Sequence, residues 1–437
     1  MADAVQGRPG APGRSAPPDV LAVAEVERAF RAESGRALAT IARLTRDVDL
    51  AEDAVQEAFL AALRTWPATG LPANPGAWIT TTARNRALDV LRREAARPGR
   101  EEAAARAAAL AGTPPVLHPV ADDQLRLLFT CCHPALPPET RVALALRLVC
   151  GRSTGEIARA LLQGEEAVAK RIQRGKRKIR AAGIPLRVPP PELLSERLPS
   201  VLDCIYLTFT EGYAASGGDD LVRHELCDEA VRLARLVVSL LPGEPGAEAL
   251  LALLLLHDSR RAARLDAAGE LVLLEHQDRG RWDRAMIAEG LRWLERAASR
   301  RPLTAAAAAY VLQAAVAAEH ARAPRWADTD WAAIVAHYDR LAALTRSPVV
   351  ELNRAVAVSF ADGPGVALPL LDRLAEDPRL ARSHRLHAAR ADVCRRLGRT
   401  AEAAGLYRRA LALAPTAPER AHLRRRLAEL GAPGAVG

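Results

Sequence analysis

The sequence predicts an all-α protein built from several helical modules. Ala, Leu, Arg and Glu dominate its 437 residues, and these are good helix formers, whereas β-strand patterns are almost absent. Proline-rich connections interrupt the helical pattern, for example at residues 67–74 and 186–191. A chain of this length that is 49% hydrophobic can form two or three domains with separate cores.

Composition limits the class of protein. The net charge of +9 favours a polyanionic partner, and an aromatic content of only 4% argues against base-stacking surfaces throughout the chain. Six scattered cysteines fit a reducing cytoplasm. No apolar run approaches the roughly 20 residues of a spanning helix, so we expect no membrane segment. Residues 1–20, rich in Pro, Gly and Ala, are predicted to be a disordered tail.

Residues 21–94 form the first predicted module. Apolar residues recur at helical spacing between positions 50 and 66, which predicts a helix with one buried side. Glu52, Asp53, Gln56 and Glu57 form its opposite, polar and acidic face. Simple solvation of that face is the plainest interpretation of these four residues alone.

A second amphipathic helix follows in the same module. Asn74 is predicted to cap it, and Pro75 suits its first position. Several of its other side chains are cations or amides, namely Arg84, Asn85, Arg86, Arg92 and Arg93.

The next segments are a linker at residues 95–120 and a second module at residues 121–186. The linker is rich in Ala and Pro and is predicted to be flexible. Cys131, Cys132 and His133 invite a metal interpretation, but adjacent cysteines lack the spacing of a zinc site and no second pair follows. We therefore expect core cysteines, and neither a metal nor a cofactor.

Residues 153–180 predict a helix-turn-helix. Ser153 and Glu156 have the spacing of a capping box at the start of the first helix. Gln163-Gly164 provides the break, because glycine tolerates a turn at little steric cost.

The second of these helices is basic. Val168, Ile172, Gly175 and Ile179 form one stripe, and the other faces carry Lys170, Gln173, Arg174 and Arg177. An apolar back with cations and amides opposite is what a helix that enters a DNA groove needs. A solvated basic helix is the simpler alternative, but capping, turn and charge together favour DNA binding.

Two stretches together resemble a known family. AEDAVQEAF at 51–59 and AWITTTARNRALDVLRRE at 77–94 resemble region 2 of bacterial sigma-70-type initiation factors, closest to the extracytoplasmic-function group. AVAKRIQRGKRKIR at 167–180 resembles the recognition helix of region 4. The resemblance implies a cytoplasmic sigma factor that binds core RNA polymerase and promoter DNA and that is not an enzyme.

The resemblance also implies roles for individual residues. It places Asp53, Gln56 and Glu57 on the polymerase, and it places Arg84, Asn85, Asp89, Arg92 and Arg93 on the −10 element. The resemblance places Arg171, Arg174 and Lys176 on the −35 element. Lys170, Gln173 and Arg177 lie on the polar faces of the same helix, so we expect them to contact that element as well. Arg171 and Lys176 are alternatively structural or phosphate-directed. Ala169 and Gly175 depart from the common pattern, so no promoter sequence carries over.

Residues 187–435 are predicted to form an additional helical domain. Ala391, Gly398, Tyr407, Ala410 and Pro415 fall at tetratricopeptide spacing, and this part also resembles the C-terminal extension of one sigma-factor subgroup. We expect it to regulate the factor in cis and to offer a surface for a protein partner or an effector.

Other functions stay open from the sequence alone. One is a helix-turn-helix regulator with a helical sensor or protein-interaction domain, and another is a scaffold or enzyme in which the C-terminal domain is dominant. His224-Glu225 begins like a zinc-protease helix, but position 228 is Asp in place of the second histidine. No glycine-rich phosphate loop or nucleophile elbow is found in the sequence.

Overall fold

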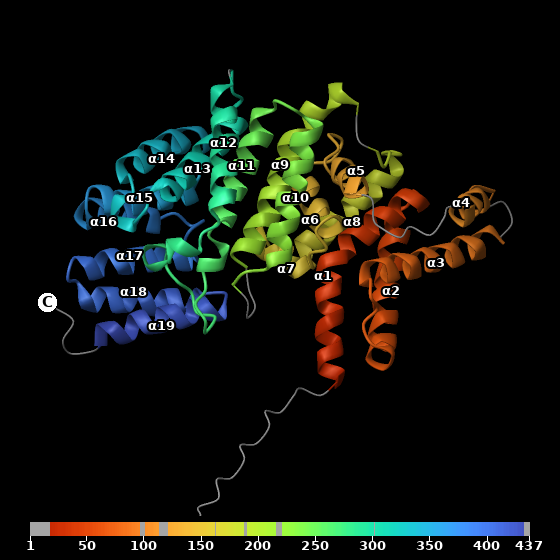
Figure 1. The fold of residues 1–437 in the computed structure, drawn as a ribbon, viewed down its shortest axis with the longest axis horizontal. Helices are drawn as coiled ribbons and strands as arrows, with labels where there is room; N and C mark the ends of the chain where they lie inside the picture. The colour runs from red at the N-terminus through yellow and green to blue at the C-terminus, as the bar shows by residue number, and fades with distance from the viewer. Residues whose placement is uncertain are drawn as a thin grey trace, which may run out of the picture. The chain divides into compact units, whose positions relative to one another are not determined.

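The computed structural model confirms the all-α fold (Figure 1). It describes residues 18–96, 101–112, 121–161, 163–187, 190–215, 221–300 and 302–431. Within these ranges the regular secondary structure is helical, and an isolated bridge joins Leu265 and Leu271. No helix in the same ranges combines the length and apolar character that crossing a bilayer requires. The predicted disordered tail lies outside the described residues up to position 17.

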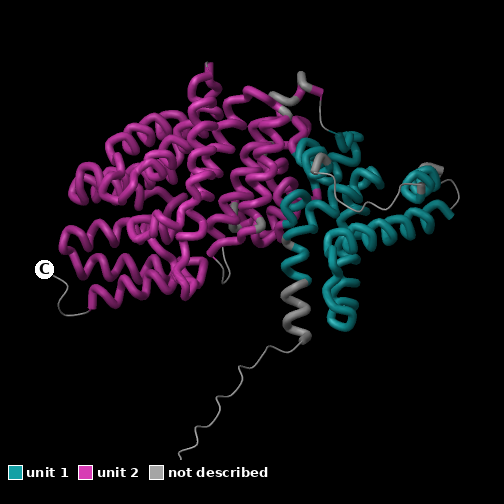
Figure 2. Tube along the Cα trace, in the orientation of Figure 1, with its two compact units in different colours: residues 1–131, 147–151, 174–188 teal, residues 132–146, 152–173, 189–437 magenta. Residues whose placement is uncertain are grey.

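The chain divides into two compact units, which Figure 2 distinguishes by colour. Unit 1 comprises residues 1–131, 147–151 and 174–188, and unit 2 comprises residues 132–146, 152–173 and 189–437. Helices α6 (Pro138–Leu148) and α8 (Glu165–Ala181) each contribute residues to both units.

Unit 1 is organised by its first three helices. Its complete helices are α1 (Pro18–Thr45), α2 (Val48–Thr69), α3 (Pro75–Ala95), α4 (Glu101–Gly112) and α5 (Ala121–Cys131). Asn74 caps α3 as predicted, since its Oδ1 accepts a hydrogen bond from the Ala77 amide at 3.0 Å. Asp47 caps α2 in the same way. Phe59 and Ile79 are buried between these helices, so the apolar stripes predicted from sequence form the core.

Helix α4 occupies part of the segment for which the sequence predicts a flexible linker. Ala103, Ala107 and Leu110 are buried and recur at helical spacing. Alanine has the highest helix propensity, and here it also supplies the packing surface. The flanking residues 97–100 and 113–120 lie outside the described residues.

The first helix of the helix-turn-helix segment lies in unit 2. The predicted capping box is present at the start of α7 (Thr154–Ala160). The Ser153 amide donates to Glu156 Oε2 at 2.8 Å, and the Glu156 amide donates to Ser153 Oγ at 3.2 Å. The two bonds satisfy backbone groups that would otherwise lack partners at the helix end.

The rest of unit 2 is a succession of helices in which each packs on its neighbours in the sequence. They are α9 (Pro191–Tyr213), α10 (His224–Leu240), α11 (Pro245–Asp258), α12 (Arg284–Ser299), α13 (Ala305–Arg322), α14 (Trp331–Thr345), α15 (Pro348–Ala361), α16 (Pro364–Ala375), α17 (His384–Arg396), α18 (Thr400–Leu413) and α19 (Ala417–Gly431). Helix α11 is buried along almost its whole length, so its leucine run is a core helix.

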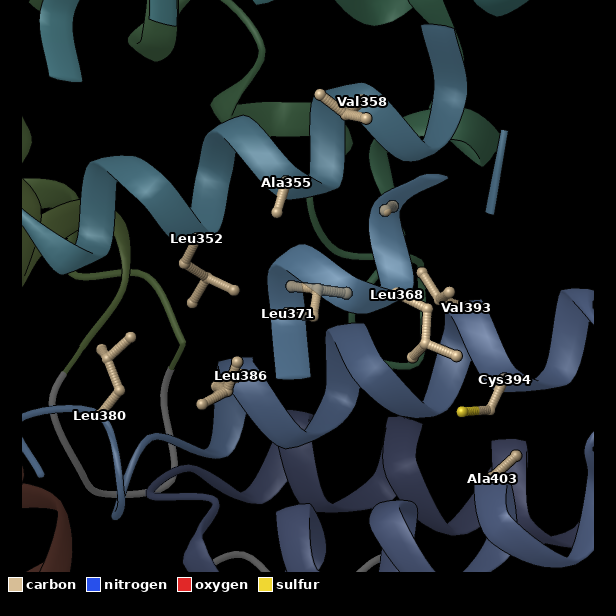
Figure 3. Packing of buried hydrophobic residues seen from close by; sticks show 11 residues of the cluster. Leu352, Ala355, Val358, Leu368, Leu371, Leu380, Leu386, Val393, Cys394 and Ala403 are labelled. Atoms are coloured by element: carbon tan, nitrogen blue, oxygen red, sulfur yellow. The ribbon is translucent and has the colours of Figure 1, made fainter. Parts of the chain in front are cut away.

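A continuous apolar core joins α15 to α18 (Figure 3). Leu352 and Ala355 of α15 face Leu371 of α16 and Leu386 of α17. Gly398 turns the chain between α17 and α18 with a φ of 75°, a conformation that glycine adopts without strain.

The contact between α12 and α11 yields a stability prediction. A Cβ atom at Gly290 would lie 2.9 Å from Leu256 Cγ and 3.3 Å from the Ala252 carbonyl oxygen. We expect Gly290→Ala to destabilise unit 2 by about 1–2 kcal/mol, because overpacking outweighs the gain in helix propensity. The matched control is Gly405→Ala on α18, where a Cβ meets open space and stability should rise by up to about 1 kcal/mol. Urea unfolding compares the two variants, and equal stabilities would contradict the close packing.

Candidate nucleic-acid interface

Helix α8 presents a polar stripe to solvent. Lys170, Gln173, Arg174 and Arg177 are exposed. Each lies three or four positions from two of the others, so the four residues share one side of the helix. Val168, Ile172 and Ile179 are buried on the opposite side, as the sequence predicts. The stripe therefore offers three cations and one amide in the arrangement needed for phosphates and base edges.

Two other predicted −35 residues are occupied by protein contacts in this conformation. Arg171 Nη2 lies 2.9 Å from Glu139 Oε2 within unit 2, and Arg171 also bonds to Gln163. Lys176 pairs in unit 1 with Asp49 at 3.1 Å and with Glu52. Both residues are at most half-exposed, so here they hold the fold.

Glu52, which the sequence places on the solvated acidic face of α2, is instead buried at the centre of an ion-pair cluster. Arg147 donates to Glu52 Oε1 from Nε at 2.8 Å, while Lys176 bonds to the other oxygen. Arg180 adds a bond to Asp49. Burial favours the neutral amine of Lys176 and is the largest influence on it, but bonds from Glu52 and Asp49 outweigh it and raise its pKa.

The predicted polymerase-docking residues lie on the exposed side of α2. Asp53, Gln56 and Glu57 are all exposed. Burial is the largest influence on Asp53 and raises its pKa, and the neighbouring carboxylates raise it further. Lys176 lowers the pKa of Asp53, but the net shift is upward. The face thus carries two exposed carboxylates and one amide.

Sequence reasoning missed an apolar part of the same face. Leu60 is 51% exposed and Leu63 is 39% exposed. Leu60 follows Gln56 by four residues and Glu57 by three, so it continues their face toward the end of α2. The sequence signal for this apolar surface was the presence of two leucines on the polar side of an amphipathic helix.

The predicted −10 residues divide into two sets on α3. Asn85, Asp89, Arg92 and Arg93 are exposed. Arg84 is half-buried and donates from Nη2 to the Leu110 carbonyl oxygen of α4 at 2.7 Å. Arg86, also exposed, lies 3.7 Å from Glu57 of α2. The structure therefore brings most of these residues to the surface and engages Arg84 with α4.

The helix-turn-helix is bonded to the C-terminal helices within unit 2. Arg223, just before α10, donates from Nη1 to Glu156 Oε1 at 2.7 Å and to Glu211 Oε1 at 2.9 Å. Burial acts to raise the pKa of Glu156, but Arg152, Ser153 and Arg223 outweigh burial and lower it. Glu156 thus caps α7 and also forms an ion pair with Arg223 of the C-terminal part of the chain.

The segment considered for a metal has other partners. Cys131 and Cys132 are buried thiols, and His133 Nδ1 accepts a hydrogen bond from the Ala135 amide at 3.1 Å. Burial lowers the pKa of His133, which favours a neutral ring. Over the residues that the structure describes, no group of three His, Cys, Asp or Glu side chains is placed to hold a metal.

Three family models match successive parts of the chain. The model for sigma-70 region 2 matches residues 29–97, and the model for sigma-70 region 4 matches residues 126–179. A family of unknown function, DUF6596, matches residues 197–298. The first two matches cover α2, α3 and the helix-turn-helix, which hold the candidate residues described above.

Two relatives are similar to this chain over different spans. An uncharacterized protein of Rhizobium meliloti is 46% identical over 404 residues, which is 91% of this chain and 94% of that protein. The probable RNA polymerase sigma factor RfaY of Xanthomonas campestris is 34% identical over 140 residues, which is 31% of this chain and 35% of that protein.

The cluster around Glu52 predicts a large stability effect. Replacing Glu52 with Gln leaves Arg147 and Lys176 without their shared charge, so we expect unit 1 to lose about 2 kcal/mol of stability. The control is Glu166→Gln, which breaks the exposed pair with Lys170 and should cost less than about 0.5 kcal/mol. Urea unfolding at low and high salt measures both, and an equally small effect at Glu52 would contradict its role.

Proposed function

The chain is a sigma-70-type RNA polymerase sigma factor, and we propose that it belongs to the extracytoplasmic-function group and is regulated in cis by its C-terminal helices. Core RNA polymerase and promoter DNA are its partners. In this proposal it acts in the bacterial cytoplasm by binding and positioning, without catalysing a reaction.

One observation carries this proposal. A region 2 match and a region 4 match lie in order on one chain, and exposed cations lie on the DNA-directed helix of each. A helix-turn-helix regulator needs only the DNA-binding helix of the region 4 match. A sigma factor needs both, because it contacts two promoter elements while it is bound to the polymerase.

Region 2 supplies the polymerase contact in this proposal. The carboxylates of Asp53 and Glu57 would steer α2 toward a basic surface of the polymerase, with Gln56 as a neutral hydrogen-bonding group beside them, and Leu60 and Leu63 would bury apolar area there. The exposed residues of α3 would then lie on the −10 element. Arg84 would join them only after leaving its bond to Leu110.

Region 4 supplies the −35 contact through the exposed stripe of α8. Arg174 is the central cation of that stripe and can meet a guanine edge or a phosphate. Lys176 would reach DNA only by exchanging Glu52 and Asp49 for phosphate. The carboxylates of α2 therefore compete with the promoter for this cation.

The C-terminal helices are proposed to be a tetratricopeptide-type domain that acts on region 4. Ala391, Tyr407 and Ala410 are buried where that repeat places its small and aromatic packing residues. Arg223 contacts the helix-turn-helix through Glu156, and Ser200 of α9 accepts a hydrogen bond from Arg141 of the preceding helix α6. A partner or effector bound to these helices would thereby influence the DNA-reading segment.

Reconstituted transcription tests the −35 assignment. With core polymerase and a cognate promoter, Arg174→Ala should weaken promoter use by about 1–3 kcal/mol. Arg409→Ala on α18 removes the same charge from an exposed site and should have no effect. Unchanged transcription by Arg174→Ala would remove the assignment. Tight duplex binding without polymerase, together with no specific start, would favour the helix-turn-helix regulator.

Regulation in cis has a separate test at Arg223. Arg223→Gln loses the charge-assisted bond to Glu156, worth about 1.5–3 kcal/mol, so a less firmly held helix-turn-helix should give several-fold lower transcription. The control is Arg235→Gln, whose partner Glu289 also lies in the C-terminal helices. Affinity for core polymerase should stay unchanged in both variants. Equal transcription by both would contradict this route of regulation.

A further inference from the structure

A cavity of about 720 Å³ lies within the C-terminal part of unit 2. Its wall includes Tyr206 and Tyr213 of α9, His257 of α11 and Tyr338 of α14. Helices α17 and α19 complete it, and Val349, Asn353 and Arg385 are wall residues that remain exposed to solvent. Cavities of roughly 300–1,000 Å³ with mainly apolar and aromatic walls and a few polar groups are typical small-molecule sites.

The connection between α11 and α12 forms one side of this cavity. Leu271 and Leu273 of that connection contribute to the wall. Arg425 of α19 pairs with Glu270, and Arg426 Nη2 lies 3.5 Å from Glu275 Oε1. The connection is therefore fixed to α19 at two points, which makes the cavity a built feature of the fold.

The wall carries cations without matching carboxylates. The Arg264 guanidinium stacks 3.9 Å from the centre of the Tyr213 ring and donates to the Tyr213 carbonyl oxygen. Among the described residues, no carboxylate forms an ion pair with Arg264 or with Arg385. Glu419 is the acidic residue of the described wall, and it is held by His384 at 3.3 Å and by Thr416 at 2.7 Å.

Three further titratable groups of the wall, His257, His422 and Tyr206, are neutral near pH 7. Burial and nearby arginines lower the pKa of His257 well below its ordinary value, and they lower that of His422 to about 4. Burial raises the pKa of Tyr206, which keeps its phenol protonated. In the described wall, Arg264 and Arg385 outnumber the carboxylate of Glu419, so the wall carries a net positive charge.

We propose that this cavity binds a small organic anion with an aromatic body, whose acidic group meets Arg264 and Arg385 and whose ring packs among the tyrosines. The aromatic wall supplies area for a flat apolar group, and the two guanidinium groups select an anion. A small molecule fits better than an acidic peptide, because the fixed connection closes one side and the volume suits a ligand of a few fused rings. The site goes beyond the proposed function, since it requires neither polymerase nor DNA.

The test uses two fluorescent probes that share one skeleton. One is 8-anilinonaphthalene-1-sulfonate, and the other is N-phenyl-1-naphthylamine, which lacks the sulfonate. The full-length chain should bind one equivalent of the sulfonate saturably. Arg385→Gln should weaken sulfonate binding about fivefold to tenfold and leave the neutral probe unaffected. Arg382→Gln is the matched control, because this exposed arginine lies outside the wall, and it should change neither affinity.

A second variant tests the location of the site. Ala388→Trp places a large ring into the cavity from α17 and should abolish binding of both probes, while its circular dichroism and cooperative melting show that it folds. Sulfonate affinity equal to wild type in Arg385→Gln would overturn the proposal, as would full binding by folded Ala388→Trp. Displacement of the sulfonate by a phenylalanine-containing polyglutamate peptide at lower concentration than by 1-naphthoate would also overturn it, in favour of a peptide site.

Discussion

A single carboxylate, that of Glu52, brings together three segments of unit 1 that lie far apart in the sequence. It receives Arg147 from the end of α6 and Lys176 from the second half of α8, while it remains buried on α2. A buried carboxylate is costly unless cations and hydrogen bonds compensate it, so the three segments are stable together. As a result, the cations of α8 have two different roles. Lys176 and Arg180 hold the fold, which leaves Lys170, Arg174 and Arg177 on the exposed stripe.

The same principle operates at the start of the helix-turn-helix. Glu156 accepts a bond from the Ser153 amide as part of the capping box, and its other oxygen accepts a bond from Arg223. The local role alone would explain a glutamate at this position. The second bond adds a dependence on the C-terminal helices, since the residue that orders the start of α7 is also the residue that they contact.

Short-range patterns made much of the structure predictable from sequence. The caps at Asn74 and Ser153 and the buried stripe of α8 depend on residues only three or four positions apart, and all are present. The contacts that were not predicted join distant residues. Lys176 and Glu52 are 124 positions apart, and Arg84 meets Leu110 through a helix expected to be a linker. Leu60 and Leu63 were overlooked because exposure of an apolar residue depends on packing. The cavity was invisible for the same reason, since its wall comes from many separate helices.

These contacts bear on how a region 4 of this kind would meet DNA. In the proposed function, the promoter has to compete with carboxylates that already neutralise Lys176 and Arg180, so each phosphate gained there costs an internal ion pair. Such an exchange yields little net free energy, and the free protein should bind duplex DNA weakly. Binding to polymerase changes the balance, because tethering region 2 near the −10 element raises the effective concentration of α8 at the −35 element. Weak intrinsic affinity combined with tethering then confines DNA reading to the polymerase-bound state, where the exposed stripe of α8 can act without a strong affinity of its own.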